Sequence, residues 1–259
     1  MLDKLKQLVL SAGRLFVKEG EAAIHDKEGH FNIVTDRDVE VQEFLREGLL
    51  SLLPGSRFFA EEQENGSLTE APTWIVDPID GAVNFTRNRA FSAISVALTK
   101  DREPVLAVVY NPFSGELFSA EKGCGAQLNG KSIHVSDLPF ERGLVTFGTS
   151  PYHPELSKAS LLAALEMLRT AGDLRRTGSA ALDLAWLACG RTDFFFELYL
   201  SPWDYAAGAL LVREAGGLIG ALDGKQLDFG IPSAIVAGSP ACFERGLSIL
   251  KESMQDKKK

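Results

Sequence analysis

Two carboxylates follow an apolar run in the segment Trp74-Ile75-Val76-Asp77-Pro78-Ile79-Asp80-Gly81. The apolar run predicts a buried strand, and the proline and glycine predict a tight turn at its end. Asp77 and Asp80 flank the proline closely enough for their oxygens and the Ile79 carbonyl to converge on one point. Oxygen ligands of this kind suit a hard cation such as Mg²⁺. The alternative is a turn in which the aspartates accept hydrogen bonds from backbone N–H groups.

Two further acidic residues follow apolar residues elsewhere in the chain. Glu61 comes directly after Phe58-Phe59-Ala60, and Asp204 stands beside Trp203 at the start of a segment with helical spacing. Together the three acidic segments resemble the inositol monophosphatase family, which consists of Mg²⁺-dependent, lithium-sensitive sugar-phosphate phosphatases. The resemblance extends over about residues 27–217.

The resemblance implies a Mg²⁺ site with ligands from both halves of the chain. The implied ligands are Glu61, Asp77, the Ile79 carbonyl, Asp80 and Asp204. The backbone N–H groups of Gly81 and Ala82, in the turn after the acids, are placed to hold phosphate oxygens. That function does not depend on a side chain.

One position departs from the family pattern. The residue after the glycine of D-P-x-D-G is normally Thr in the family, and here it is Ala82. In the family that hydroxyl, oriented by the acid that matches Asp38, positions the attacking water and helps to deprotonate it. The implied catalytic positions are therefore Asp38, Glu61 and Ala82, the last without its hydroxyl. Asp38 has an equally good alternative interpretation, as an acid placed favourably in the first turn of a helix.

Recognition of the leaving group is expected in the second half of the chain. The segment Arg176-Thr177-Gly178-Ser179-Ala180 opens a predicted helix, whose N–H groups at Ser179 and Ala180 could bind a polyol. Ser179 fits an ordinary N-cap equally well. Glu197 matches the family's acid that accepts hydrogen bonds from substrate hydroxyls, or it is a strand-end carboxylate facing water. Lys27 matches a family loop lysine near the metal, or it is a solvated loop residue.

Composition narrows the possible partners. The chain has 259 residues, of which 45% are hydrophobic, so it can build a sizeable core. A net charge of -8 gives the chain no general attraction for nucleic acid or for an anionic membrane. Three widely spaced cysteines suggest no disulfide framework, and no apolar stretch predicts a secretion signal or a membrane span. We therefore expect a soluble cytoplasmic protein that acts on a small phosphate ester, and the resemblance adds a homodimer.

The elements that position these residues form two groups. Helical spacing predicts helices over about residues 2–20 and 36–53, and three apolar segments within residues 92–121 predict an antiparallel meander. Asn129-Gly130 predicts a type I′ hairpin. From residue 144 strands and helices alternate, with a strand ending at Glu197 and a helix over residues 202–214.

We therefore expect α+β and α/β units in one layered sandwich of alternating α-β-α-β-α layers, like that of the sugar phosphatases. An N-terminal α+β domain (residues 1–143) would carry most metal ligands. A C-terminal α/β domain (residues 144–259) would carry Asp204 and the substrate-recognition residues, with the site between the two.

The expected function is Mg²⁺-dependent hydrolysis of inositol monophosphate, or of a related sugar or polyol phosphate, by metal-activated water. One alternative within the superfamily is a phosphatase for fructose 1,6-bisphosphate or for a nucleotide. Another is a catalytically impaired member that binds metal and phosphate, because Ala82 replaces the usual threonine.

Overall fold

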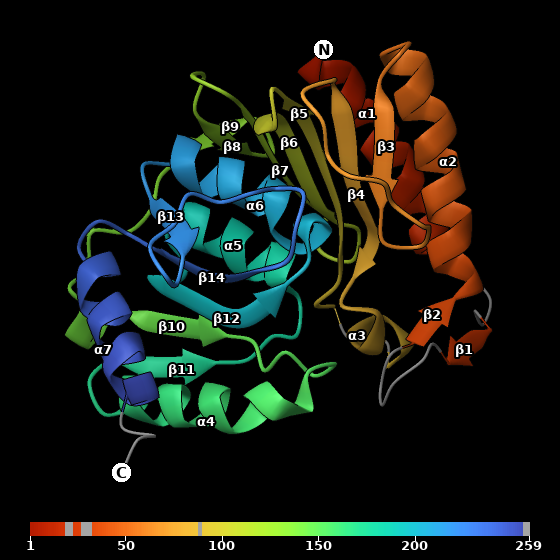
Figure 1. The fold of residues 1–259 in the computed structure, drawn as a ribbon. Coiled ribbons are helices and arrows are strands. Elements are labelled where there is room, and N and C mark those ends of the chain that lie inside the picture. Colours follow the sequence, from red (N-terminus) through yellow and green to blue (C-terminus); the bar gives the residue numbers. More distant parts are fainter. Residues whose placement is uncertain (19–22, 27–32, 88–89, 256–259) are drawn as a thin grey trace.

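Five layers in the order α-β-α-β-α make up the fold (Figure 1). The computed structural model describes residues 1–18, 23–26, 33–87 and 90–255. Helices α1 (Leu2–Phe16) and α2 (Asp36–Leu52) form one outer layer, and α4 (Pro154–Leu168) and α7 (Phe243–Gln255) form the other. Helices α5 (Ala180–Ala188) and α6 (Pro202–Glu214) lie between the two sheets. The predicted layered fold class is confirmed.

The first sheet has seven strands in the order β3-β4-β5-β6-β7-β8-β9. Neighbouring strands are antiparallel except β3 and β4, which are parallel. The strands are β3 (Arg57–Ala60), β4 (Thr73–Asp80), β5 (Ala93–Lys100), β6 (Glu103–Asn111), β7 (Glu116–Glu121), β8 (Ala126–Leu128) and β9 (Lys131–Ile133). The predicted meander and hairpin are both confirmed. Asn129 and Gly130 connect β8 to β9 with φ values of 50° and 78°, as a type I′ turn requires.

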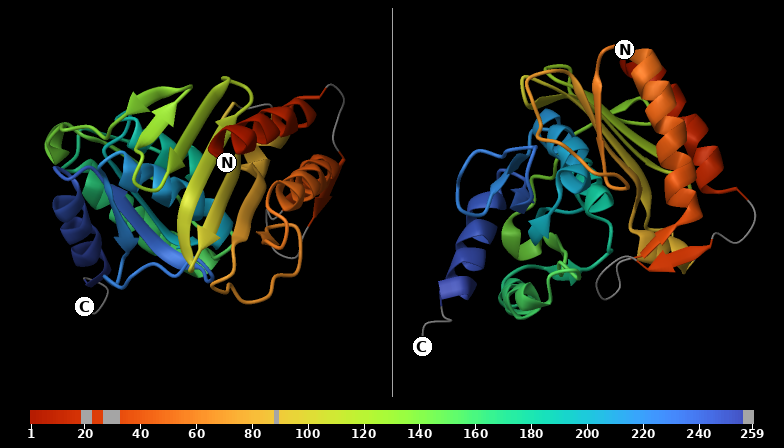
Figure 2. Two further views of the ribbon diagram at one scale, coloured as in Figure 1. Left: turned by 90° about the horizontal axis from the view of Figure 1, so that it is seen from above. Right: turned by 45° about the vertical axis from the view of Figure 1, so that its right-hand side comes forward.

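Helix α1 is amphipathic and covers the outer face of this sheet together with α2 (Figure 2). Its buried residues include Leu5, Val9, Ala12 and Phe16, which recur three or four positions apart and so share one helix face. A short two-stranded sheet, β1 (Ile24–Asp26) and β2 (Ile33–Thr35), precedes α2.

The second sheet has the order β11-β10-β12-β14-β13, with the first three strands parallel and the remaining neighbours antiparallel. Its strands are β10 (Leu144–Phe147), β11 (Asp173–Arg175), β12 (Phe194–Leu200), β13 (Leu218–Ala221) and β14 (Ser233–Gly238). The predicted end of β12 at Glu197 is wrong. The strand continues because Leu198 and Leu200 are also buried, and Glu197 therefore lies inside the strand.

The middle helices pack closely against both sheets. An added Cβ on Gly208 of α6 would lie 2.6 Å from Leu184 Cβ of α5, so the close approach of the two helices requires a glycine. One apolar cluster contains residues of α5, of α6 and of both sheets. A single turn of 3-10 helix, Phe140–Arg142, lies where we placed the domain boundary, and the division at residue 143 stays a prediction.

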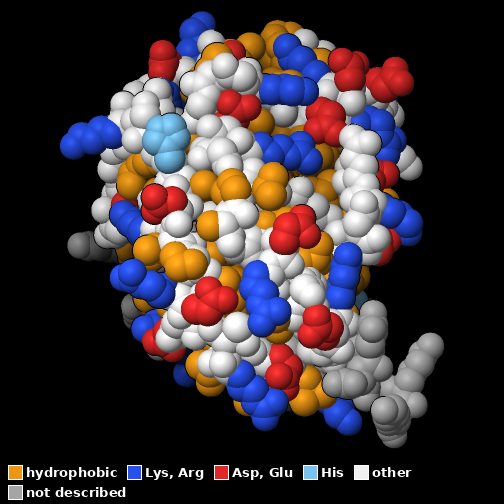
Figure 3. Space-filling model, turned by 90° about the vertical axis from the view of Figure 1, so that its left-hand side faces the viewer, with side chains coloured by type: hydrophobic (Ala, Val, Ile, Leu, Met, Phe, Trp, Pro, Cys, Tyr) orange, Lys and Arg blue, Asp and Glu red, His pale blue; other side chains and the backbone are white. Residues whose placement is uncertain are grey.

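The surface view in Figure 3 shows acidic and basic side chains interspersed over the face that carries α7. Among the described residues, no helix is both long enough and apolar enough to cross a membrane.

Candidate functional site

Strand β4 carries Asp77 and Asp80 into the interior, since all eight of its residues are buried. In a regular strand, residues three positions apart point to opposite faces of the sheet. The pairing of β4 with β5 shifts register between Asp77 and Asp80, and Pro78 lies in this irregular stretch. Proline is tolerated there because a bulge interrupts the ladder of hydrogen bonds. The bulge allows both carboxylates to face the same point.

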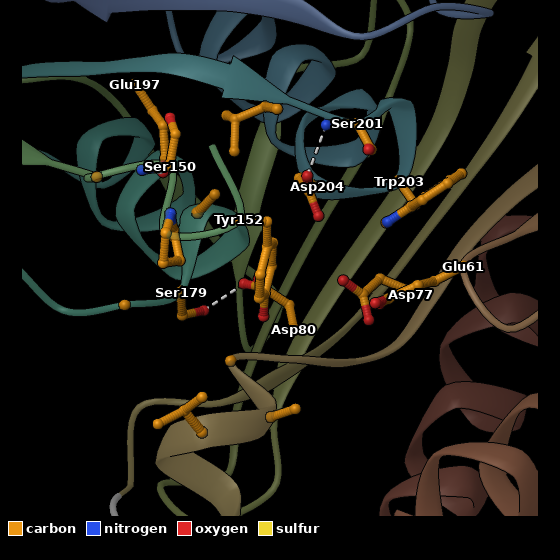
Figure 4. Close-up of a pocket in the computed structure, with 18 of the residues that line it drawn as sticks. Glu61, Asp77, Asp80, Ser150, Tyr152, Ser179, Glu197, Ser201, Trp203 and Asp204 are labelled. Carbon is orange, nitrogen blue, oxygen red and sulfur yellow. Dashed lines mark hydrogen bonds between the residues drawn. The ribbon is translucent and has the colours of Figure 1, made fainter. Parts of the chain in front are cut away.

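Asp204 reaches that point from the other half of the chain. It lies in the first turn of α6, where it forms a capping box with Ser201: the Ser201 N–H donates to Asp204 Oδ2 over 2.7 Å. Asp77, Asp80 and Asp204 each offer one carboxylate oxygen within 4.8 Å of the others. Figure 4 shows these side chains, with Glu61 beside Asp77.

One oxygen of each of these carboxylates accepts a hydrogen bond within the protein. Asp77 Oδ1 accepts the Ile79 N–H over 2.9 Å, and Asp80 Oδ2 accepts the Ala181 N–H over 2.9 Å and the Ser179 hydroxyl. The predicted capping turn is therefore present. It does not exclude the metal site, because the second oxygen of each carboxylate can still coordinate a cation.

The electrostatics of the cluster favour a cation. Burial, followed by the charges of Glu61, Asp80, Asp204 and Asp38, raises the pKa of Asp77 well above its usual range. Burial raises the pKa of Asp80 to about 6, although hydrogen bonds from Ser179 and Ala181 oppose the shift. A bound divalent ion would offset the repulsion among these carboxylates, and their hard oxygen donors fit Mg²⁺.

A cavity of about 830 Å³ surrounds the cluster and is lined by both halves of the chain. Its lining includes ten of the predicted site residues: Glu61, Asp77, Ile79, Asp80, Gly81, Ala82, Ser179, Ala180, Glu197 and Asp204. Asp38 does not line the cavity, and Lys27 lies outside the described residues. The structure thus brings together nearly all the residues that the sequence singled out.

The turn after the acids is fixed by a glycine and leads into a short helix that we did not predict, α3 (Ala82–Thr86). Gly81 has a φ of +85°, and an added Cβ would lie 2.8 Å from the Phe91 carbonyl oxygen. Asn84 Nδ2 donates to the carbonyl oxygens of Phe91 and Thr177 over 2.8 and 2.9 Å. This side chain therefore ties the turn to the segment that precedes α5.

Asp38 stabilises the start of α2. Its Oδ2 accepts the Thr35 N–H over 2.8 Å and the Thr35 hydroxyl over 2.5 Å, and the side chain is buried. The Thr35 side chain in turn accepts the Asp38 N–H, which completes a capping box and supports the structural interpretation of this residue. Asp38 nevertheless contributes to the raised pKa of Asp77, so it lies within electrostatic reach of the cluster. Its catalytic role stays a prediction.

Glu197 is buried on the opposite side of the cavity, and the water-facing alternative is wrong. Its Oε1 accepts the Ser150 N–H over 2.8 Å. An added Cβ on Gly148 would lie 1.8 Å from Glu197 Oε2, so the carboxylate occupies the space that a side chain at Gly148 would fill. Burial raises the pKa of Glu197 to about 7, against the hydrogen bond from Ser150.

Sequence reasoning missed several residues that line the cavity. They are Ser150, Tyr152, His153, Arg176, Asp183, Tyr199 and Trp203. Arg176 begins the segment that leads into α5 and Trp203 adjoins Asp204, but Tyr152 and His153 lie in a connection between a strand and a helix. The proline on either side of this pair was the only signal for a fixed turn.

Comparison with known proteins identifies the family. A family model described as "Inositol monophosphatase family" matches residues 4–255. The chain belongs to the inositol monophosphatase family. This confirms the resemblance inferred from the three acidic segments, and it supports a phosphatase of the hydrolase class.

Known relatives and solved structures match almost the full length of this inositol monophosphatase family member. Nus factor SuhB of Escherichia coli (strain K12) is 33% identical over 261 residues, covering 99% of this chain and 97% of SuhB. The structure of the Thermotoga maritima IMPase superposes with a TM-score of 0.88 at 30% identity and 98% coverage of both chains. An IMPase/NADP phosphatase complexed with Mg²⁺ and phosphate gives a TM-score of 0.83 at 26% identity, covering 95% of this chain and 92% of that one.

Proposed function

We propose that this protein hydrolyses phosphate monoesters of polyols or sugars, with inositol monophosphate as the first substrate to test. The observation that carries the proposal is the convergence of Asp77, Asp80 and Asp204 within 4.8 Å in a cavity that also contains the Gly81–Ala82 turn. Family membership supports the same reaction class.

The proposed metal is Mg²⁺, held by Glu61, Asp77, the Ile79 carbonyl, Asp80 and Asp204. When bound, Mg²⁺ neutralises phosphoryl charge and acidifies coordinated water. The structurally similar IMPase/NADP phosphatase was solved as a complex with Mg²⁺ and phosphate, which supports this choice. Because net repulsion among buried carboxylates disfavours the metal-free site, the chain should bind the cation tightly.

Other residues of the chain would bind the phosphate group and the leaving group. The N–H groups of Gly81 and Ala82 would hold phosphate oxygens. Ala180 and Glu197 would contact the hydroxyls of the leaving group. Ser179 is already used by the fold, since its N–H donates to the Thr177 hydroxyl oxygen and its hydroxyl donates to Asp80. The buried Glu197 already accepts the Ser150 N–H through Oε1. Its second oxygen, Oε2, lies in the space that Gly148 leaves because it has no side chain.

The proposal is tested by measuring phosphate release from a panel of phosphate monoesters in Mg²⁺ and after chelation. The panel contains inositol monophosphate, glycerol phosphates, fructose 1,6-bisphosphate, a nucleotide 3′-phosphate and an aryl phosphate. We expect Mg²⁺-dependent turnover that is fastest on a polyol or sugar ester. Turnover that survives full chelation would refute the metal assignment.

A second candidate is a binding protein that retains metal and phosphate but turns over poorly. Two observations favour it: Ala82 lacks the family hydroxyl, and one close relative is named a Nus factor. Tight Mg²⁺-dependent phosphate binding without turnover on the panel would select this candidate.

Three further properties are proposed from the family resemblance alone. Lithium should inhibit by occupying a Mg²⁺ position after turnover, and full activity in lithium at limiting Mg²⁺ would exclude this. The protein should be a homodimer by sedimentation equilibrium. It should reside in the cytoplasm, which cell fractionation would check.

A further inference from the structure

Ala82 has no hydroxyl that could donate a hydrogen bond to a bound phosphate. Any hydroxyl donor must therefore come from another residue that lines the cavity. Among the described residues, those that line the cavity and carry a hydroxyl are Ser150, Tyr152, Ser179, Tyr199 and Ser201. All three serines take part in hydrogen bonds of the fold, and Ser179 and Ser150 use their hydroxyl hydrogens in them. Ser179 donates to Asp80, Ser150 donates to the Tyr199 carbonyl over 3.4 Å, and the Ser201 side chain accepts an N–H of the first turn of α6.

Of the two tyrosines, Tyr152 is the one directed at the acids. The ring of Tyr199 lies against His153, with ring centroids 3.7 Å apart. The Tyr152 side chain lines the cavity that contains the acids, and in the view of Figure 4 it overlaps Asp80. Its hydroxyl forms no hydrogen bond with the part of the chain that the structure describes.

A tyrosine phenol is protonated at neutral pH, so Tyr152 is a neutral hydrogen-bond donor. Its surroundings are acidic: partial desolvation raises the pKa of the half-exposed Tyr152, and the charges of Glu61, Asp204, Asp77 and Asp80 raise it further. All four carboxylates therefore lie within electrostatic reach of the phenol. A neutral donor of this kind can stand among the acids and still donate to an incoming anion, whereas a lysine would pair with the acids themselves.

The backbone holds Tyr152 in place. Ser150 has a φ of 45°, a conformation that non-glycine residues rarely adopt. The Ser150 N–H donates to Glu197 Oε1 over 2.8 Å, its Oγ accepts the Tyr199 N–H over 3.0 Å, and its carbonyl accepts the His153 N–H over 2.8 Å. Pro151 and Pro154 restrict the chain on either side. The turn is therefore anchored to β12 before any ligand binds.

We propose that Tyr152 donates its phenolic hydrogen to an oxygen of the phosphoryl group bound at the Asp77, Asp80 and Asp204 cluster. This inference rests on the proposed function, because it takes the reacting phosphate to lie at that cluster. Tyr152 is then a residue that contacts the substrate, and it supplies the phosphoryl group with a hydrogen-bond donor from the second half of the chain.

The test is Tyr152→Phe, which removes the hydroxyl and keeps the ring. A lost hydrogen bond to a charged group should lower kcat/KM on the best ester by about tenfold to a hundredfold. The affinity for inorganic phosphate in Mg²⁺, measured by calorimetry, should fall in the same range. Because Tyr152 is 49% exposed, the variant should keep its thermal unfolding midpoint. Tyr110→Phe is the control, since Tyr110 lies beside Gly13 of α1 and outside the cavity.

Two outcomes would overturn the inference. Either both readouts match the wild type, or kcat/KM falls while phosphate affinity stays unchanged, which would assign the hydroxyl to the leaving group. If the wild type hydrolyses no ester on the panel, the proposed function fails, and the phosphate titration of wild type and variant still decides the role of Tyr152.

Discussion

The hydroxyl of Ser179 donates a hydrogen bond to Asp80 Oδ2 although the two residues are 99 positions apart in the sequence. Asp80 ends β4, and Ser179 is the N-cap of α5. The Ala181 N–H donates to the same oxygen over 2.9 Å. A single carboxylate oxygen thus connects the two halves of the molecule, and the same side chain offers an oxygen to the acidic cluster.

This relationship predicts how stability depends on pH in the metal-free protein. The pKa of Asp80 is about 6 in the folded state, against 3.8 for an ordinary aspartate. The folded state therefore binds this proton more tightly than the unfolded chain. The stabilisation that follows is present at low pH and is lost as the pH rises through about 6.

The measurement is urea unfolding in a chelator across that pH range. Other carboxylates also titrate there, so the informative quantity is the difference from Asp80→Asn, in which this contribution is absent. We expect the free energy of unfolding of the wild type to fall relative to the variant as the pH rises. The opposite slope would contradict the assignment.

A second prediction concerns Asp77→Asn. The amide keeps an acceptor for the Ile79 N–H and removes a buried charge that its acidic neighbours repel. The metal-free variant should therefore unfold at a higher temperature than the metal-free wild type. Its stabilisation by added Mg²⁺, and its Mg²⁺-dependent activity, should be severely reduced. An undiminished Mg²⁺ response in a folded variant would exclude Asp77 as a ligand.

A third prediction uses Gly148, whose missing side chain leaves room for the Glu197 carboxylate. Gly148→Ala should displace that carboxylate, and Glu197→Gln should weaken its hydrogen bonds. Both should weaken polyol phosphate binding, through KM, by about 1.5 to 3 kcal/mol. An aryl phosphate, which offers no hydroxyls, should be nearly unaffected. Gly220→Ala is the control, because among the described residues no atom beyond its own chain neighbours lies within 4 Å of its added Cβ. Equal losses on both esters would point to a structural role for Glu197.

A fourth prediction concerns Ala82, at the start of α3. Ala82→Thr should raise kcat tenfold or more, since a positioned proton acceptor typically contributes about 10² to 10⁴ in rate. KM should change little, because the restored contact acts mainly in the transition state. Adding Asp38→Asn should remove most of the gain in kcat. Because this substitution also changes the contacts of residue 38 with Thr35, the stability of the double variant is measured in parallel. An unchanged kcat in Ala82→Thr would mean that the water is activated by another route.

The features that sequence predicted correctly are those with local physical causes. The amphipathic spacing of Leu5, Val9 and Ala12 is enough to define the buried face of α1. Asn129-Gly130 tolerates positive φ at both positions, which favours a type I′ turn regardless of the rest of the fold. An apolar run that ends in Asp77 and Asp80 predicts buried carboxylates that require compensating partners, and the motifs around them were sufficient to indicate the family.

Only the tertiary structure decided how these residues meet. The register shift in β4 places Asp77 and Asp80 together, because β5 pairs with both sides of the irregularity. The interior position of Glu197 depends on the burial of Leu198 and Leu200 beyond it. The turn that aims Tyr152 is held by Glu197 through Ser150. Each of these features depends on contacts between residues far apart in the chain. The packing and hydrogen bonds of these contacts outweigh the local conformational preferences of the residues. A local sequence pattern carries no information about such distant partners.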